Sequence, residues 1–204
     1  MNGLRLAAVA LLLLAVGCGT PEVSVETVGT VDVVPDTFSR ERRRMNVDQL
    51  RSAVIATTGG ISWTELRGTT NVDLFLELSP TLGKPDYLGA TEEELEPALL
   101  FQKFLDDASK KVCADLIELE QLRTPGERVF LVRAELTDPA TSQAARANLR
   151  AALLRFHGHD WPEGDSRLQP WQRLIEQADD GFGIELAWQT VCVALFTHPD
   201  FYSY

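Results

Sequence analysis

Residues 184–196 carry only three polar side chains, those of Glu185, Gln189 and Thr190. A helix over this range would be apolar on nearly every side. Such a helix is stable only where other elements surround it, because any face left in water would expose apolar surface. We therefore expect a central, buried helix over these residues, ended by Pro199, with the rest of the domain packed around it.

Two segments in the first half of the chain have local signals for secondary structure. Residues 47–57 are predicted to form a helix, because Asn46 and Gln49 have the spacing of a capping box and Gly59 follows as a C-terminal cap. In residues 72–78, valine and leucines recur at every second position. This alternation fits a short strand, and it also fits a helical turn.

A long helix is predicted to start at Thr91 and to run to Gln121, with apolar residues at helical spacing. Thr91 and Glu94 form a capping-box pair at its start. Pro97 would disturb the second turn of that helix. We therefore expect either a kink at Pro97 or a later start.

Two more helices are expected before the final one. The first begins at Asp138-Pro139, where a capping residue precedes proline, and ends at Gly158. Residues 168–178 have the periodicity of the second. The predicted fold is mostly α (all-α): a single compact bundle of about five helices, with a short extended N-terminal tether and one small strand pair. The apolar content of 45% is sufficient for a hydrophobic core.

The N-terminal residues have the layout of a bacterial secretory signal. Arg5 supplies a positive charge, and the apolar run over residues 6–16 is too short to span a bilayer, which needs about 20 residues. The run ends in Ala15-Val16-Gly17-Cys18, which resembles the lipobox of bacterial lipoprotein signal peptides. The resemblance implies a signal peptide over residues 1–17 and acylation of the Cys18 thiol.

The same resemblance implies an address in the bacterial cell envelope. Residues 18–45 would be a lipidated N-terminus and tether, and residues 46–204 a helical domain that faces the periplasm or lies at the outer membrane. Gly19 replaces the Asp that retains enteric lipoproteins in the inner membrane, which favours the outer membrane. Four arginines near the tether's end would contact lipid headgroups or an acidic partner, or form a solvated turn with local ion pairs: Arg40, Arg42, Arg43 and Arg44.

The charge balance excludes one class of partner. Acidic residues outnumber basic residues by 30 to 19, and the formal net charge is −11. Loss of residues 1–17 would remove Arg5 and leave −11 − 1 = −12. Nucleic-acid-binding proteins usually carry a basic surplus, so no nucleic-acid partner is expected. The membrane is expected to be contacted through the lipid anchor.

Two cysteines remain after Cys18, and the sequence leaves their state open. In an oxidising compartment Cys113 and Cys192 would form a disulfide. Both also lie in strongly apolar helical segments, where they would be stable as buried free thiols. The chain has no C-x-x-C pair and no C-x-x-C-H motif, so neither a thioredoxin-like activity nor covalent haem attachment is expected.

The most suggestive cluster for chemistry is His157-Gly158-His159-Asp160. Two imidazoles and a carboxylate can bind one metal ion, so His157, His159 and Asp160 are weak candidate metal ligands. The alternative is a polar segment that ends a helix, with His157 near the negative helix end. His198-Pro199-Asp200 is interpreted in the same structural way, as the end of the last helix.

No pattern for a nucleophile or a phosphate-binding loop is present. The segment Gly60-Ile61-Ser62-Trp63-Thr64 lacks the second glycine of a G-x-S-x-G elbow, and no P-loop or G-x-G-x-x-G occurs. We therefore predict no catalytic residue and no cofactor. The four tryptophans are expected to pack between helices: Trp63, Trp161, Trp171 and Trp188.

Two short stretches of the mature part have a second resemblance. Residues 43–50, RRMNVDQL, and residues 188–201, WQTVCVALFTHPDF, resemble the opening and the end of helical domains in large secreted proteins of planctomycetes and myxobacteria. Those proteins often carry cytochrome c modules. The resemblance implies a free-standing relative that assists such a system, and it implies no catalytic residue.

These observations predict a non-enzymatic accessory or binding protein of the envelope, with an envelope protein as its partner. One alternative is a metal-dependent enzyme that uses His157, His159 and Asp160. A second alternative is an electron-transfer accessory that binds haem non-covalently through a histidine.

Overall fold

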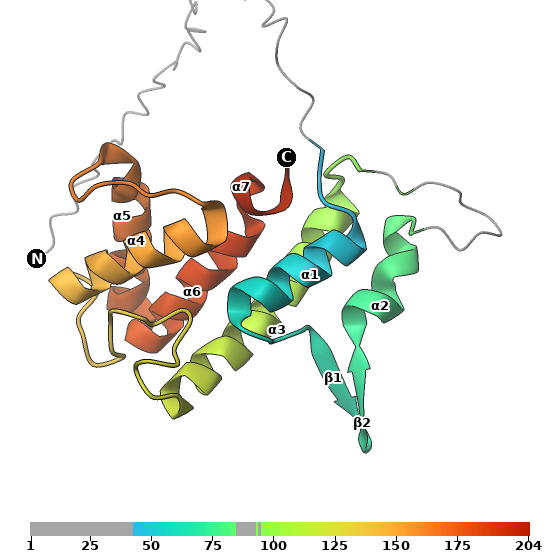
Figure 1. Cartoon of the computed structure of the whole chain (residues 1–204), viewed down its shortest axis with the longest axis horizontal. Coiled ribbons are helices and arrows are strands. Elements are labelled where there is room, and N and C mark those ends of the chain that lie inside the picture. Colours follow the sequence, from blue (N-terminus) through green and yellow to red (C-terminus); the bar gives the residue numbers. More distant parts are fainter. Residues whose placement is uncertain (1–42, 85–92, 94) are drawn as a thin grey trace, which may run out of the picture. The chain divides into compact units, whose positions relative to one another are not determined.

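The computed structural model describes residues 43–84, 93 and 95–204 of the chain, and this part is mostly helical (Figure 1). The expected mostly α fold with one small strand pair is confirmed. The elements in chain order are α1 (Val47–Thr58), β1 (Thr64–Arg67), β2 (Thr70–Asp73), α2 (Leu74–Leu78), α3 (Leu99–Leu122), α4 (Gln143–His157), α5 (Gln169–Phe182), α6 (Ile184–Thr197) and α7 (Pro199–Tyr202), with 3₁₀ turns at Ser79–Leu82 and Ser166–Leu168.

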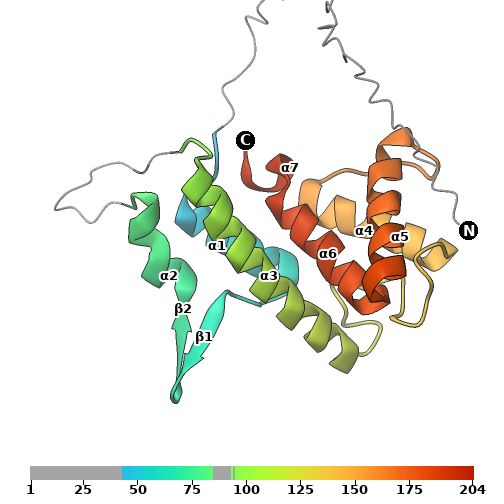
Figure 2. The same ribbon diagram turned by 180° about the vertical axis from the view of Figure 1, so that it is seen from behind.

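Helix α6 has the central position expected from its composition. It packs against α3 and α5 along its length and also contacts α4 (Figures 1 and 2). Trp188 lies in its second turn and is fully buried. Because α6 is surrounded, its apolar faces are removed from water on several sides. Its buried residues are Ala187, Trp188, Val191, Cys192, Leu195 and Phe196.

A disulfide joins α6 to α3. Cys113 and Cys192 are bonded, and their Cα atoms are 5.8 Å apart. Both side chains are fully buried. Of the two states left open by the sequence, the structure has the disulfide.

Helix α1 begins and ends as the sequence predicts. The Asn46 side chain accepts a hydrogen bond from the Gln49 backbone N–H, and the Gln49 side chain accepts one from the Asn46 N–H. Gly59 ends the helix with a φ of 71°. A Cβ atom there would lie 3.0 Å from Cγ1 of Val129, so both the backbone and the packing favour glycine.

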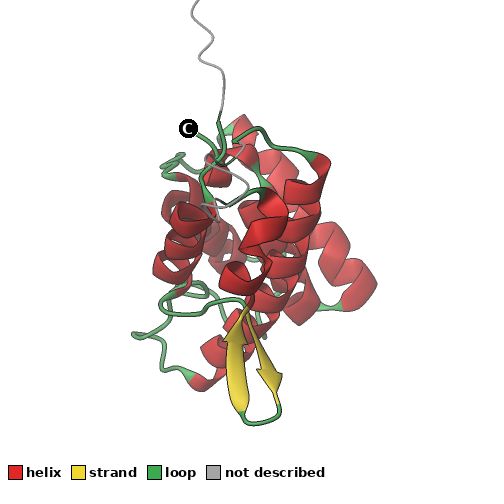
Figure 3. Cartoon of the chain, turned by 90° about the vertical axis from the view of Figure 1, so that its right-hand side faces the viewer, coloured by secondary structure: helices red, strands yellow, loops and turns green. Residues whose placement is uncertain are grey.

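The alternating segment over residues 72–78 ends a strand with its first two residues and forms a short helix with the other five. Strands β1 and β2 form an antiparallel hairpin, visible in Figure 3, with Thr64 opposite Asp73. The Asp73 carboxylate then accepts hydrogen bonds from the N–H groups of Phe75 and Leu76 and caps α2. Asp73 is therefore both the last residue of the strand and the capping residue of the helix that follows.

The start of α3 follows the second of the two outcomes expected at Pro97. The helix begins at Leu99, after the proline, and it is not extended back through it. Ala98 is at the N-cap position and makes no side-chain capping bond. The capping-box pair expected at Thr91 and Glu94 lies outside the described residues.

The start expected for α4 at Asp138-Pro139 is wrong. The helix begins at Gln143, and the hydroxyl of Ser142 caps it by accepting from the Ala145 N–H at 3.0 Å. The Asp138 carboxylate instead accepts from the N–H of Glu135, on its N-terminal side, at 2.8 Å. The Asp138 carboxylate thus closes the preceding turn and does not cap a helix.

The long connection between α3 and α4 is organised by one buried carboxylate. Glu120 is fully buried and accepts hydrogen bonds from three successive backbone N–H groups, those of Val129, Phe130 and Leu131, at 2.8–3.0 Å. Arg123 donates to the same carboxylate at 2.9 Å. A buried charge with this many donors is stabilised, and the loop takes its shape from them.

The described part of the chain begins with a segment bound to the domain. The backbone of Arg43 pairs with that of Tyr204 in both directions. Arg44 is 2% exposed and donates to the Glu93 carboxylate at 2.6 Å, and its guanidinium lies over the ring of Phe101. Arg44 is therefore not in a solvated turn. Among the described helices, none combines the length and the hydropathy needed to cross a bilayer.

Candidate functional site

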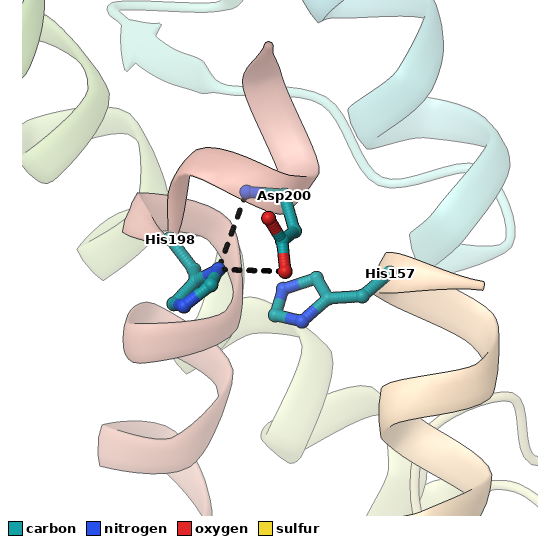
Figure 4. A group of neighbouring side chains, drawn as sticks. All are labelled: His157, His198 and Asp200. Atoms are coloured by element: carbon teal, nitrogen blue, oxygen red, sulfur yellow. Dashed lines mark hydrogen bonds and ion pairs between the residues drawn. The ribbon is translucent and has the colours of Figure 1, made fainter. Parts of the chain in front are cut away.

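The three histidines of the chain lie together where helices α4 and α6 end. His157 is the last residue of α4, and His198 separates α6 from α7. The rings of these two residues are stacked, with centroids 4.9 Å apart, and the His159 ring is 6.0 Å from that of His157. Figure 4 shows the two stacked rings beside the carboxylate of Asp200.

The position of His157 follows from a proline. In a helix, the carbonyl of Leu195 would accept from the N–H four residues later, but residue 199 is proline and has no N–H. The Nε2–H of His157 donates to the Leu195 carbonyl at 2.9 Å instead. His157 therefore satisfies the end of α6 and joins α4 to it. This bond places the proton on Nε2 and leaves Nδ1 as the lone-pair nitrogen in the neutral ring.

Asp200 is the second centre of the group. Its carboxylate Oδ2 accepts from Nε2–H of His159 at 2.9 Å and lies 3.5 Å from Nδ1 of His198. Its backbone N–H donates to the same Nδ1 of His198 at 3.2 Å, which caps the short helix α7. Asp200 is therefore fixed at its backbone by one histidine and at its side chain by another.

Two tryptophans line the group. The Trp171 ring centroid lies 5.6 Å from that of His157 and 5.8 Å from that of His198. Trp161 stacks on His159, with centroids 4.6 Å apart and planes inclined by 13°. The expectation of packing between helices is met for Trp171, whereas Trp161 stacks within the connection that follows α4. The aromatic rings restrict the orientation of the imidazoles.

The surroundings favour the neutral imidazole of His157 and the ionised carboxylate of Asp200, each of which has a lone pair to offer a metal ion. Burial lowers the pKa of His157 and outweighs the hydrogen bond to the Leu195 carbonyl, which raises it. The hydrogen bond from His159 lowers the pKa of the Asp200 carboxyl. A neutral imidazole and an ionised carboxylate are the forms that bind metal ions. The site therefore holds a ligand-competent His157 and Asp200 at neutral pH.

The structure brings together only part of the group expected from the sequence. His157 and His159 are neighbours, but Asp160 points elsewhere: its side chain is 79% exposed and lies 4.0 Å from Arg150. The carboxylate beside the histidines is Asp200. For its partner His198 the sequence predicts only a structural role, at the end of the last helix. The signal that could have found both is the recurrence of a histidine close to an aspartate at two helix ends, His157-Gly158-His159-Asp160 and His198-Pro199-Asp200.

One set of three side chains has the arrangement of metal ligands. One ligand atom each from His157, His198 and Asp200 lie within 4.8 Å of one another. Two imidazoles and one carboxylate are a common donor set for divalent transition metals. Comparison with family models, with curated proteins and with solved structures finds no match to this chain. The chemistry of the site is therefore argued from its own geometry.

Proposed function

We propose that the protein is a lipid-anchored protein of the bacterial cell envelope whose helical domain is a non-enzymatic accessory or binding module. One observation carries the proposal. The chain has three cysteines, and Cys113 and Cys192 are bonded to each other. Cys18, directly after the apolar run, is left for the acylation that the lipobox resemblance implies. A buried disulfide is also typical of proteins that fold in an oxidising compartment such as the periplasm.

The length of the tether supports the accessory role. Acylation at Cys18 would leave residues 18–42 between the anchor and the bound segment at Arg43. A chain of this length reaches at most roughly 80–90 Å when fully extended. The domain would thus reach partners well above the membrane surface while remaining concentrated near it. With its acidic surplus, the domain gains no attraction from an anionic lipid surface.

Co-purification from the native host tests this role. The full-length chain would carry a short streptavidin-binding tag after Tyr204, which is 65% exposed, and would be extracted from membranes with mild detergent. We expect one envelope protein to be recovered in stoichiometric amount from the wild type. The Cys18→Ser variant is the matched control, because it keeps the domain and loses the acylated thiol; it should be absent from the membrane fraction. A membrane-bound chain recovered alone would overturn the accessory role.

Two alternatives to the accessory role, a haem-binding accessory and a metal-dependent enzyme, can be tested on the same purified protein. A haem-binding accessory would show a Soret absorption band after incubation with haemin, whereas a colourless protein excludes this alternative. The His157–His198–Asp200 group favours a second candidate function, the binding of a metal ion. A metal-dependent enzyme would use this ion in catalytic turnover. An accessory protein would bind the ion without turnover.

A further inference from the structure

We propose that His157, His198 and Asp200 form a binding site for one divalent first-row transition-metal ion, with Zn²⁺ as the reference ion and His159 as a positioning residue. The proposal goes beyond the accessory role and does not depend on the anchor. It replaces Asp160 of the sequence-based hypothesis by Asp200 and adds His198. The site lies where α4, α6 and α7 meet (Figure 4).

The donor set matches this class of ion. Nitrogen and carboxylate ligands bind Zn²⁺ at about 2.0–2.2 Å, so the donors of a tetrahedral site lie roughly 3.3 Å apart. Here the three ligand atoms lie within 4.8 Å of one another. Side-chain movements that shorten these separations by up to roughly 1.5 Å would bring the donors to tetrahedral spacing. Three protein ligands leave a fourth position for water or for a small ligand.

Hydrogen bonds to groups outside the three ligands orient two of them, His157 and Asp200, in advance. Ligating histidines usually donate their second ring N–H to a carbonyl or a carboxylate, and ligating carboxylates are hydrogen-bonded in turn. His157 has such a bond, from Nε2–H to the Leu195 carbonyl at 2.9 Å. Asp200 has one too, from His159 at 2.9 Å. These bonds supply the outer shell that a metal site requires.

One polar atom of the group is left unsatisfied. Nδ1 of His157 is buried and has no hydrogen-bond partner among the described residues. Buried polar atoms in folded proteins are nearly always paired, and an exception calls for an ion or a water molecule. The neutral tautomer fixed by Leu195 makes this nitrogen a lone-pair donor. A cation bound at Nδ1 would give this nitrogen a partner.

The local field also favours a cation. Helices α4 and α6 both end at the group, with His157 as the last residue of one and His198 directly after the other. The C-terminus of a helix carries a partial negative charge from its unpaired carbonyls. The Asp200 carboxylate adds a full negative charge. Two helix ends and a carboxylate therefore converge on the stacked imidazoles.

The test is a metal titration of the full-length chain in detergent. The protein would carry the streptavidin-binding tag, because a polyhistidine tag would bind the ion itself, and it would be stripped of metal with a chelator beforehand. Calorimetry with Zn²⁺ should give one saturable site per chain with a dissociation constant of micromolar or below. Co²⁺ should give visible absorption bands of a nitrogen and oxygen site, and it should quench fluorescence from Trp171, which lies beside two of the ligands.

Four variants distinguish the ligands from the positioning residue and from a residue outside the group. His157→Ala and Asp200→Asn should each weaken Zn²⁺ binding at least about 100-fold, because a ligand is lost. His159→Gln should weaken it on the order of 10–100-fold, as removal of an outer-shell partner does. Asp160→Asn is the matched control, because Asp160 is exposed and lies apart from the group, and its affinity should be unchanged.

Two results would overturn the site. The first is the absence of saturable Zn²⁺ binding by the folded wild type. The second is wild-type affinity in both the His157→Ala and the Asp200→Asn variants. Circular dichroism of each variant shows whether the helical fold is retained. If a ligand variant does not fold, the His159→Gln variant is used in its place. A Co²⁺ spectrum and an affinity identical to those of the wild type would then contradict the proposal. A failure here leaves acylation at Cys18 untouched, so the two proposals fail separately.

Discussion

Nε2 of His159 lies 2.9 Å from Oδ2 of Asp200, across 41 positions of sequence. This contact fastens the segment after α4 to the short helix α7. Both side chains are about one-third exposed, at 34% and 30%. Both residues therefore lie at the rim of the domain, outside the core. From there His159 can orient Asp200.

The exposure of this pair separates a positioning role from a structural one. In the metal-free protein, His159→Gln should lower the free energy of unfolding by less than about 1 kcal/mol, because a partly exposed side-chain contact contributes little. Chemical denaturation of metal-free wild type and variant measures this. A loss of several kcal/mol would mean that His159 mainly holds the fold together, and would remove its assignment as a positioning residue.

The disulfide between α3 and α6 should contribute strongly to stability. Cys113 and Cys192 are separated by 79 positions, and a crosslink over a loop of this size is worth about 4 kcal/mol in the chain-entropy model. A reducing agent that opens the bond should lower the denaturation midpoint accordingly. The double variant Cys113→Ala, Cys192→Ala should have the lower midpoint already and should not respond to the reductant. Equal midpoints for oxidised and reduced wild type would contradict the prediction.

Glu120 should be the most sensitive acidic position on α3. Glu120→Ala leaves three backbone N–H groups of the α3–α4 connection without their buried acceptor, which we expect to cost about 3 kcal/mol. Amide hydrogen exchange should accelerate at Val129, Phe130 and Leu131. Glu118→Ala, on the exposed side of the same helix, should change stability by less than about 0.5 kcal/mol. Equal effects of the two substitutions would show that the connection does not depend on Glu120.

Asp165 provides a prediction for pH. The Arg167 guanidinium donates to both carboxylate oxygens, at 3.0 and 2.6 Å, and with the Arg167 backbone N–H it lowers the pKa of Asp165 from 3.8 to about 2. Because the folded-state pKa lies below the ordinary value, the pair's contribution to stability is present above pH 3.8 and is lost as the pH falls towards 2. The Arg167 side chain is 61% exposed, so the contribution is small.

A carboxyl-detected NMR titration measures this pKa directly. In the wild type the Asp165 signal should titrate near pH 2. In Arg167→Gln it should titrate at a clearly higher pH, because only the backbone N–H of residue 167 is left to lower the pKa. Arg173→Gln, at another arginine that follows the same loop, should leave the titration unchanged. An unshifted Asp165 in the wild type would refute the interaction.

The helices were predictable where local chemistry and tertiary packing agree. The capping box at Asn46 and Gln49 and the apolar run of α6 each specify one structure. At Asp138-Pro139 the local signal misled, because Asp138 accepts from the N–H of Glu135 and closes a turn. A strong capping pair thus predicts a helix only if the side chain has no nearer donor.

The candidate site was only half predictable for a geometric reason. His157 and His159 are close in sequence, so their proximity could be inferred. The approach of His198 and Asp200 depends on how the ends of α4 and α6 pack, and on the Leu195 carbonyl that Pro199 leaves without a donor. Long-range packing of this kind leaves no periodic trace in the sequence.

The most direct test of the proposed function is the intact mass of the protein purified from its host's membranes. We predict a chain that begins at Cys18, carries a diacylglyceryl group on that residue, and loses two further mass units of hydrogen to the Cys113–Cys192 disulfide. Treatment with a reductant should restore those two units and leave the lipid in place. A chain that begins at any other residue, or an unmodified Cys18, would contradict the account.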